Sequence, residues 1–283
     1  MFGPPQPGDP MRPGWNPVRR NRNIGTPAQG HGEDNRLTIP QSWHDRSVFY
    51  ERLGACATFT QRVNGHCLRF FVEPTRSGWF HPCSVEDALE ILAQVPAQDL
   101  AVLDFIVMRQ PTRKQRILRP VWGRAVFAFE KGPHAGTAIV LEAQPLETTV
   151  WRKALDPQDQ RELDRLHADG HQIRKTRRSI TIAPTAASLR NTVLYRTLLH
   201  ELGHHVDYRR FSAQEWDSRP SAQKEDYAHR YASEHCARLR QAGVVPFDPQ
   251  RDAALRQEYG LKDQWFLSPQ GTVEPWSCSP STT

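Results

Sequence analysis

The chain has 283 residues, of which 38% are hydrophobic and 24% are charged. This composition supports a folded core and excludes a wholly disordered chain. It contains no run of about 18 uncharged apolar residues, which excludes a membrane-spanning helix. The amino-terminal residues MFGPPQPGDPMRPGW lack the apolar segment of a secretory signal, and five widely spaced cysteines do not suggest a disulfide framework. We therefore predict a cytoplasmic protein, with export by a route that leaves no cleaved signal as the open alternative.

The net charge is +6, from 37 Lys+Arg against 31 Asp+Glu, and the excess is local. No acidic residue lies between Asp104 and Glu130, or between Asp169 and Glu201, whereas both intervals are rich in Lys and Arg. Such runs form solvated basic faces in some proteins and bind nucleic acid, acidic lipid or acidic protein in others. Because no aromatic pattern of a known nucleic-acid module accompanies them, we favour a solvated face and keep nucleic acid as an alternative partner.

Composition and pattern divide the chain into four predicted segments. Residues 1–42 are rich in Pro, Gly, Asn and Arg and have no hydrophobic period, which predicts a disordered tail. Residues 43–150 are predicted to form an α+β region of unknown role. Residues 151–272 are predicted to form a domain that carries the chemistry, and residues 273–283 a second loose end.

The first folded region mixes strand and helix signals. Strand-like runs at 57–63 and 67–72 flank Asn64-Gly65, a pair that predicts a β-hairpin. A helix is expected to begin after Ser84, an N-cap with an acid three residues later, and to end near Gln94. Further strands are predicted at residues 103–108, 121–129 and 137–141. The fold class is therefore α+β.

From Asp156 the pattern becomes helical. Asp156-Pro157 predicts an N-cap followed by Pro in the first helical position, with a stop near Gly170. A short alternating strand is expected at 179–183, and helices at about 188–208 and 222–241. For the last of these helices, Ser221 is the expected cap and Gly243 the expected end.

The sharpest motif is the segment LLHELGH at residues 198–204. His200 and His204 are four residues apart on a predicted helix, so they project from one face and can bind one metal ion. Two imidazoles suit Zn²⁺, and Glu201 beside them can act as a base on a water molecule. Gly203 costs a helix about 1 kcal/mol relative to Ala, which indicates close approach by another element. The alternative interpretation is a helix with ordinary solvated histidines.

A third ligand is expected on the next helix, in the segment KEDYAHRYA. Glu225 follows His204 by 21 residues, which allows a turn and a return helix. Ala228 and Ala232 share its face and would let the two helices pack closely. The alternative is that Glu225 is a surface carboxylate. Asp226, Glu234 and His235 are weaker ligand candidates.

The two segments together resemble the zincin metallopeptidases of the gluzincin type. The pattern Glu225-x-x-Ala228 with flanking aromatics is also similar to catalytic domains of lethal-factor-like toxin proteases. The resemblance covers residues 178–242. It implies a zincin-like domain, made of a short strand, the HExxH helix and a return helix. It also implies one Zn²⁺ per chain, with His200, His204 and Glu225 as ligands and Glu201 as general base.

The resemblance carries further expectations about the surroundings of the metal. A strand before the metal helix lines the cleft in this family and pairs with extended substrate, and residues 179–183 match its place. An acid that supports the site often follows the glutamate ligand by one turn, and here that position is His229. Asp207 or Asp226 would then orient the imidazoles, or the surroundings differ. Four side chains are candidate donors to the oxyanion: Tyr227, Tyr231, Tyr208 and His235.

The sequence therefore predicts a zinc-dependent metallopeptidase acting on a protein or peptide. One alternative is a non-catalytic, zinc-stabilised binding protein associated with nucleic acid, and another is a metal hydrolase that cleaves a non-peptide amide. A second group of residues has the donor types of a structural zinc site: Cys56, His66, Cys67, His81 and Cys83. Their spacing matches no zinc knuckle, so we interpret the cysteines as free thiols.

Overall fold

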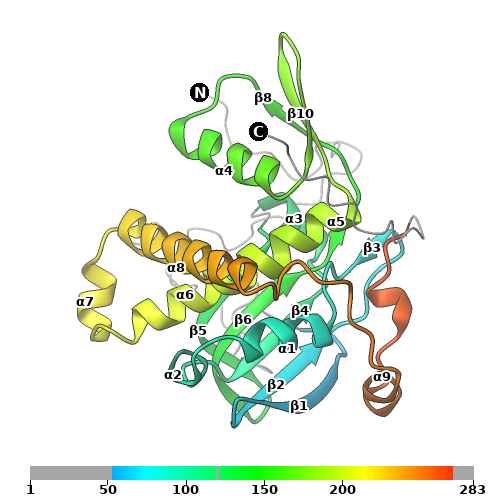
Figure 1. The fold of residues 1–283 in the computed structure, drawn as a ribbon, viewed down its shortest axis with the longest axis vertical. Coiled ribbons are helices and arrows are strands. Elements are labelled where there is room, and N and C mark those ends of the chain that lie inside the picture. The colour runs from blue at the N-terminus through cyan, green and yellow to red at the C-terminus, as the bar shows by residue number, and fades with distance from the viewer. Residues whose placement is uncertain (1–52, 119–120, 270–283) are drawn as a thin grey trace, which may run out of the picture. The chain divides into compact units, whose positions relative to one another are not determined.

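The computed structural model describes residues 53–118 and 121–269. The predicted tail at 1–42 and the predicted loose end at 273–283 lie outside this part of the chain. The described residues belong to one compact unit, Tyr50–Thr283. They form an α+β structure, as the sequence predicts, in which a five-stranded sheet, a three-stranded sheet and a set of helices are the main parts (Figure 1).

The larger sheet has the strand order β1-β2-β4-β6-β5. Its strands are β1 (Ala57–Val63), β2 (His66–Val72), β4 (Phe105–Arg109), β6 (His134–Glu142) and β5 (Gly123–Lys131). The three central strands are parallel, and the two outer strands, β1 and β5, run antiparallel to their neighbours. The predicted hairpin is confirmed, because Asn64 and Gly65 both adopt positive φ, 48° and 79°, between β1 and β2.

Helices cover one face of this sheet, and the alternation of side chains along the strands separates the two faces. Phe70, Ile106 and Ile139 pack against the helices, whereas Phe71 and Val107 belong to a smaller cluster on the opposite face. The covering helices include α1 (Val85–Ala93), α6 (Leu198–Tyr208) and α8 (Ser221–Gln241). Two short helices, α2 (Ala97–Leu100) and α3 (Arg113–Leu118), lie between the strands in sequence.

The predicted cap of α1 is confirmed. Ser84 and Asp87 form a reciprocal capping box at its amino terminus, and Gln94 is its C-cap. Asp87 also receives two hydrogen bonds from Arg190, at 2.8 and 3.0 Å, and one from the backbone N–H of Gln250 at 2.8 Å. This buried cluster joins α1 to the helical part of the chain.

The helix predicted at 188–208 is present but is not a uniform α-helix. It consists of α5 (Ala186–Arg190), a π-helical segment η2 (Asn191–Thr197) and α6. Within η2 the Thr197 hydroxyl donates to the Thr192 carbonyl oxygen at 2.8 Å. A π segment widens the helix, and such segments are frequent beside functional sites.

The return helix α8 ends as predicted but begins differently. Gly243 adopts φ 69° just beyond its end, as expected for a helix stop. Ser221 does not cap it, because the N-cap is Pro220 and Ser221 is already the first helical residue. The remaining helices are α7 (Ala213–Ser218) between α6 and α8, and α9 (Ala253–Tyr259) and η3 (Asp263–Trp265) after α8.

The smaller sheet has the order β8-β10-β9, with all neighbours antiparallel. Its strands are β8 (Thr149–Arg152), β10 (Ser179–Ala183) and β9 (Gln172–Lys175). Helix α4 (Pro157–Ala168), capped by Asp156 as predicted, packs on one face of it. A third pair joins β3 (Trp79–Phe80) to β7 (Gln144–Pro145).

The main hydrophobic core takes residues from both predicted folded regions. It includes Phe70 and Ile106 from the first and Leu198, Leu202 and Trp265 from the second. The predicted boundary at 150/151 falls within β8. Among the described helices, none is both long enough and apolar enough to cross a bilayer.

Candidate metal centre

The three predicted ligands converge where α6 and α8 pack together. The Nε2 atoms of His200 and His204 lie 3.2 Å apart. A carboxylate oxygen of Glu225 lies 3.3 Å from Nε2 of His200, and its other oxygen lies 3.6 Å from Nε2 of His204. Two imidazoles from α6 and one carboxylate from α8 thus face one another across the helix contact.

These separations fit a small tetrahedral cation. Zn²⁺ holds imidazole nitrogen and carboxylate oxygen at about 2.0–2.1 Å, so two such ligands on a tetrahedral ion lie about 3.3 Å apart. Burial lowers the pKa of His204 to about 4, so its imidazole is neutral near pH 7, the form that binds metal. The donor set and its spacing therefore fit Zn²⁺ at this position.

Gly203 makes the convergence of the two helices possible. A Cβ atom on Gly203 would lie 3.1 Å from Cα of Ala228 and 3.1 Å from Cβ of Tyr231, both on α8. Ala228 is itself fully buried at this crossing. The sequence expectation that another element approaches the helix at Gly203 is confirmed, and that element is α8.

Replacing Gly203 with Leu is expected to weaken zinc binding and to destabilise the protein together. The added side chain must push α8 away from α6, and such overpacking costs about 1–3 kcal/mol or more. Because α8 carries Glu225, the displacement also separates the ligands. Isothermal titration with Zn²⁺ and thermal unfolding measure the two effects. Unchanged zinc affinity in this variant would contradict the role assigned to the crossing.

Glu201 is held between the metal helix and the larger sheet. Its donor atom and those of His200 and His204 all lie within 4.8 Å of one another. The residue is only 8% exposed, and the backbone N–H of Ala125 in β5 donates a hydrogen bond to it. Burial raises the pKa of Glu201 to about 7. A carboxylate with a pKa in this range can accept and return a proton near neutral pH.

A contribution from β5 to the site was not among the sequence predictions. A Cβ atom on Gly123 would lie 2.6 Å from Cγ2 of Thr197 and 3.4 Å from Cγ of Glu201. Gly123 therefore lets the strand approach α6 directly beside the base. A lone Gly inside a strand pattern is a signal of close backbone approach, and Gly123 within the strand predicted at 121–129 could have indicated this contact.

The strand predicted to line the cleft is not placed to pair with substrate. Ser179–Ala183 forms β10, the central strand of the smaller sheet, so β8 and β9 already occupy both of its edges. The strand beside Glu201 is instead β5, which is an edge strand of the larger sheet. The prediction used sequence order alone, which does not reveal which strands become edges.

Asp207 is buried but does not contact the imidazoles. Its carboxylate accepts hydrogen bonds from Arg219 at 2.7 Å and from Arg210 at 3.3 Å, which ties the turn after α6 to the helix. Asp226 is an exposed residue of α8. Nδ1 of His200 is buried and has no hydrogen-bond partner among the described residues. The surroundings of the candidate ligands therefore differ from the expected pattern.

His229 lies directly against the ligands. Its ring centroid is 4.3 Å from that of His200, and donor atoms of His229, His200 and Glu225 lie within 4.8 Å of one another. An imidazole here is a candidate oxyanion donor. His205, the neighbour of His204, is buried on another side of α6, with its Nε2 bonded to the carbonyl oxygen of Ala138 at 3.0 Å.

The hydroxyl of one tyrosine candidate and the rings of the other two contact groups that are not ligands. The hydroxyl of Tyr231 donates to Asp99 at 2.9 Å, and its ring lies 4.2 Å from that of His235. Tyr227 lies beneath the guanidinium groups of Arg210 and Arg230. Tyr208 packs on aromatic side chains, with its ring 4.5 Å from Phe127. His229, at the position where the resemblance implies a supporting acid, is thus in contact with a ligand and becomes a further candidate donor to the oxyanion.

The second predicted group of Cys and His residues does not converge. His66 bonds to the carbonyl oxygen of Leu103 at 2.6 Å, and His81 bonds to that of Glu73 at 2.8 Å. Cys56, Cys67 and Cys83 are free thiols. Among the described residues, none of these five side chains belongs to a group with metal-site spacing.

Comparisons of the chain with family models, with curated proteins and with solved structures find no match. The function is therefore inferred from the site itself.

Proposed function

We propose that the protein is a zinc-dependent metallopeptidase that hydrolyses peptide bonds with Glu201 as general base. The observation that supports this most strongly is the convergence of His200, His204 and Glu225. The two imidazole Nε2 atoms lie 3.2 Å apart, and different oxygens of the Glu225 carboxylate lie 3.3 Å from one and 3.6 Å from the other, close to the spacing of ligands on a tetrahedral ion. Three protein ligands leave one position of such an ion for water or substrate, which distinguishes a catalytic zinc site from a structural one.

Zinc, when bound, would polarise the scissile carbonyl group and lower the pKa of the attacking water. Glu201 would accept a proton from that water and then donate it to the leaving amine, which needs a carboxylate near the ligands and shielded from bulk solvent. Its burial and its hydrogen bond from Ala125 fix the carboxylate for this role. His229, whose ring lies beside that of His200, would donate to the developing oxyanion.

Two features of the fold support a zincin-like domain. The metal helix α6 and the return helix α8 pack closely through Gly203 and Ala228, so the return helix delivers the glutamate ligand. In addition, the edge strand β5 precedes α6 in the chain and lies against Glu201. An extended peptide that paired with this edge would pass beside the base. In this proposal β5 takes the role of pairing with substrate that was expected of the strand at residues 179–183.

Removal of zinc is expected to abolish cleavage and to lower the melting temperature, and added zinc is expected to restore both. A ligand present at 100 times its Kd stabilises the folded state by about 2.7 kcal/mol. The assay incubates the full chain with an unbiased peptide library, with and without a chelator, and identifies new amino termini by mass spectrometry. Cleavage that persists at full rate in the chelator would contradict the proposal.

A further inference from the structure

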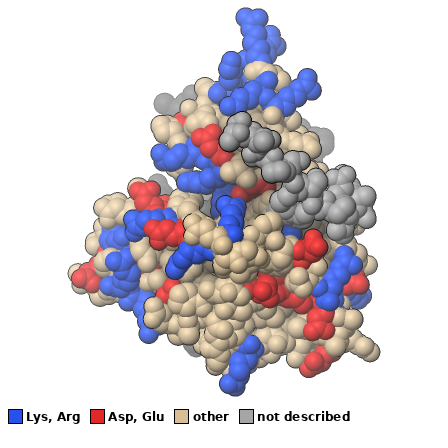
Figure 2. Space-filling view, viewed as in Figure 1, with Lys and Arg blue, Asp and Glu red and all other residues tan. Residues whose placement is uncertain are grey.

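The smaller sheet carries a set of basic side chains that the metal centre does not use. Residues 149–153, at β8, and 172–178, at β9 and the turn to β10, include six exposed cations and no acid: Arg152, Lys153, Arg174, Lys175, Arg177 and Arg178. We call this surface of β8, β10 and β9 the basic sheet. Figure 2 shows Lys and Arg gathered at the upper end of the view, where Figure 1 places β8 and β10.

These cations have no acidic partner among the described residues, unlike five arginines elsewhere in the structure. Arg109, Arg190, Arg196, Arg219 and Arg256 each form an ion pair with Asp or Glu. Among the described residues, no ion pair includes any of the six side chains of the basic sheet. The positive charge of this surface is therefore not neutralised within the described structure, and it favours an anionic partner.

The strand register places an unpartnered face beside this charge. Val150 pairs with Thr181, which pairs with Arg174, and Arg152 pairs with Ser179, so these side chains share the outer face. The opposite face, with Ile180 and Ile182, is covered by α4. Val150 is 66% exposed, and among the described residues it is the one large hydrophobic residue with an exposed side chain. The outer face thus combines two cations with an apolar contact.

The side chains and the free strand edges of this surface favour a polypeptide over a nucleic acid as its partner. Its outer face has no aromatic side chain on which bases could stack, as single-stranded nucleic acids require. The outer edges of β8 and β9 pair with no other described strand. A free strand edge can add an extended peptide through backbone hydrogen bonds, whereas a nucleic acid would use only the charge.

The basic sheet is also linked to the candidate metal centre through α4 and Trp122. Arg196, one helical turn before His200, binds Glu162 of α4 at 3.1 Å and Asp169 at 2.8 Å. Trp122 packs against both the main core and the cluster beneath the basic sheet. Trp122 immediately precedes Gly123, the β5 residue beside Glu201. A chain bound along β5 would therefore reach the small sheet at this end of the strand.

We propose that the basic sheet binds an extended, acidic segment of the protein substrate. The identification of that partner as a substrate rests on the proposed function, whereas the binding surface does not. The alternative role for cations on free edges is to prevent aggregation between sheets, and that role predicts no affinity for acidic peptides.

The test measures binding separately from cleavage. The full chain carrying Glu201→Gln is titrated into a fluorescein-labelled peptide of alternating Glu and Thr, and into a matched peptide of alternating Gln and Thr. Fluorescence anisotropy reports the Kd at low and at physiological salt. A DNA duplex and vesicles containing phosphatidylserine are the competing probes.

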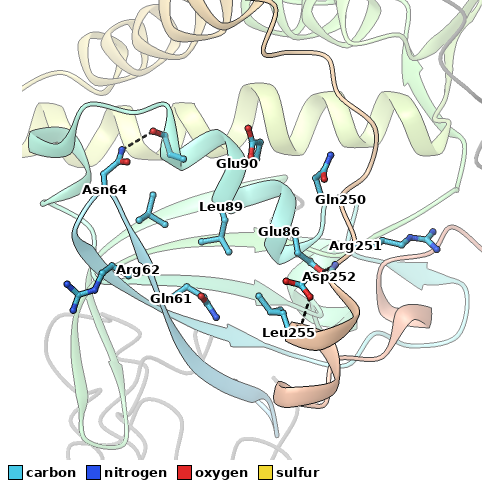
Figure 3. Close-up of a pocket in the computed structure, with 12 residues that line it drawn as sticks. Gln61, Arg62, Asn64, Glu86, Leu89, Glu90, Gln250, Arg251, Asp252 and Leu255 are labelled. Carbon is cyan, nitrogen blue, oxygen red and sulfur yellow. Dashed lines mark hydrogen bonds between the residues drawn. The ribbon is translucent and has the colours of Figure 1, made fainter.

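The test variant is Arg152→Glu/Arg174→Glu on the outer face. The control is Arg62→Glu/Arg251→Glu, which makes the same charge change beside the groove between β1, α1 and residues 250–255. Figure 3 shows both control arginines at that groove, and both are exposed. We expect the acidic peptide to bind, the neutral peptide not to bind, and the affinity to fall with salt. The test variant should bind at least about tenfold more weakly, and the control should match the parent.

Several outcomes would overturn the inference. Equal loss in the two variants would show attraction by net charge alone, and tighter binding of the duplex or the vesicles would assign the surface to nucleic acid or lipid. Circular dichroism and zinc content show that each variant is folded. If the acidic peptide binds but the wild type cleaves no peptide, the proposed function is contradicted, whereas the inference that the basic sheet binds acidic peptide stands. If Arg152→Glu/Arg174→Glu in the otherwise wild-type chain cleaves peptide at an undiminished rate, the inference about the basic sheet fails and the proposed function stands.

Discussion

The variant Glu201→Gln is expected to lower kcat/KM for any cleaved peptide by about 10²- to 10⁴-fold, the range of general acid–base catalysis. Gln has the size of Glu and can keep the contact with β5, but its amide cannot accept and return the proton. Because Glu201 is not one of the three ligands that converge, the variant should bind zinc as the wild type does.

The matched control is Glu234→Gln. Glu234 lies on α8 like Glu225, but its side chain is 64% exposed and forms one weak ion pair with Arg230 at 4.0 Å. Steady-state kinetics on a peptide selected from the library measures all three proteins. Full activity in Glu201→Gln would remove the residue from the mechanism. A parallel loss of zinc and activity would make Glu201 a ligand instead of the base.

Replacement of Arg190 with Met is expected to lower the free energy of unfolding by about 3–5 kcal/mol, the cost of breaking a buried ion pair. The side chains of Arg190 and Asp87 are 4% and 2% exposed, and the pair joins two elements 103 residues apart. Without the guanidinium, Asp87 keeps a buried negative charge. Burial already raises the pKa of Asp87, and the loss of Arg190 would raise it further.

The loss of unfolding free energy in Arg190→Met is also expected to depend on pH in a definite direction. A carboxyl group whose folded pKa lies above its unfolded pKa favours unfolding at high pH, and that effect disappears once the group is protonated in both states. The deficit of Arg190→Met should therefore shrink as the pH falls through the pKa of Asp87. Urea unfolding followed by circular dichroism measures it, with Arg230→Met as the exposed control. A loss below about 1 kcal/mol would show that the pair does not hold these elements together.

The elements that could be predicted depend on local signals. The Asn64-Gly65 turn, the cap at Ser84 and the cap at Asp156 each act within a few residues, and all three are present as expected. His200 and His204 come together because one helical turn separates them. The contact with Glu225 needed the further guess of a return helix, and Gly203 and the small residues of α8 supported it.

The parts that could not be predicted depend on pairing between distant segments. The sequence cannot show that β10 becomes a central strand while β5 becomes an edge, because both alternate in the same way. From the sequence, Asp207 could orient an imidazole or bind Arg219. It binds Arg219 because the chain turns through α7 and brings Arg219 back to the end of α6. Tyr231 meets Asp99, 132 residues away, and no local pattern reports such a contact.

The measurement that tests the central claim most directly is the zinc affinity and stoichiometry of the purified full chain, of Glu225→Ala and of Asp226→Ala. Asp226 is the exposed acid next to Glu225 on the same helix, so its variant controls for loss of surface charge. We expect one zinc per chain in the wild type and in Asp226→Ala. Loss of an outer partner of a ligand costs about 10- to 100-fold in metal affinity, so loss of the ligand Glu225 should cost more. The absence of zinc from all three proteins after zinc is supplied, or undiminished affinity in Glu225→Ala, would contradict the two-histidine, one-glutamate site.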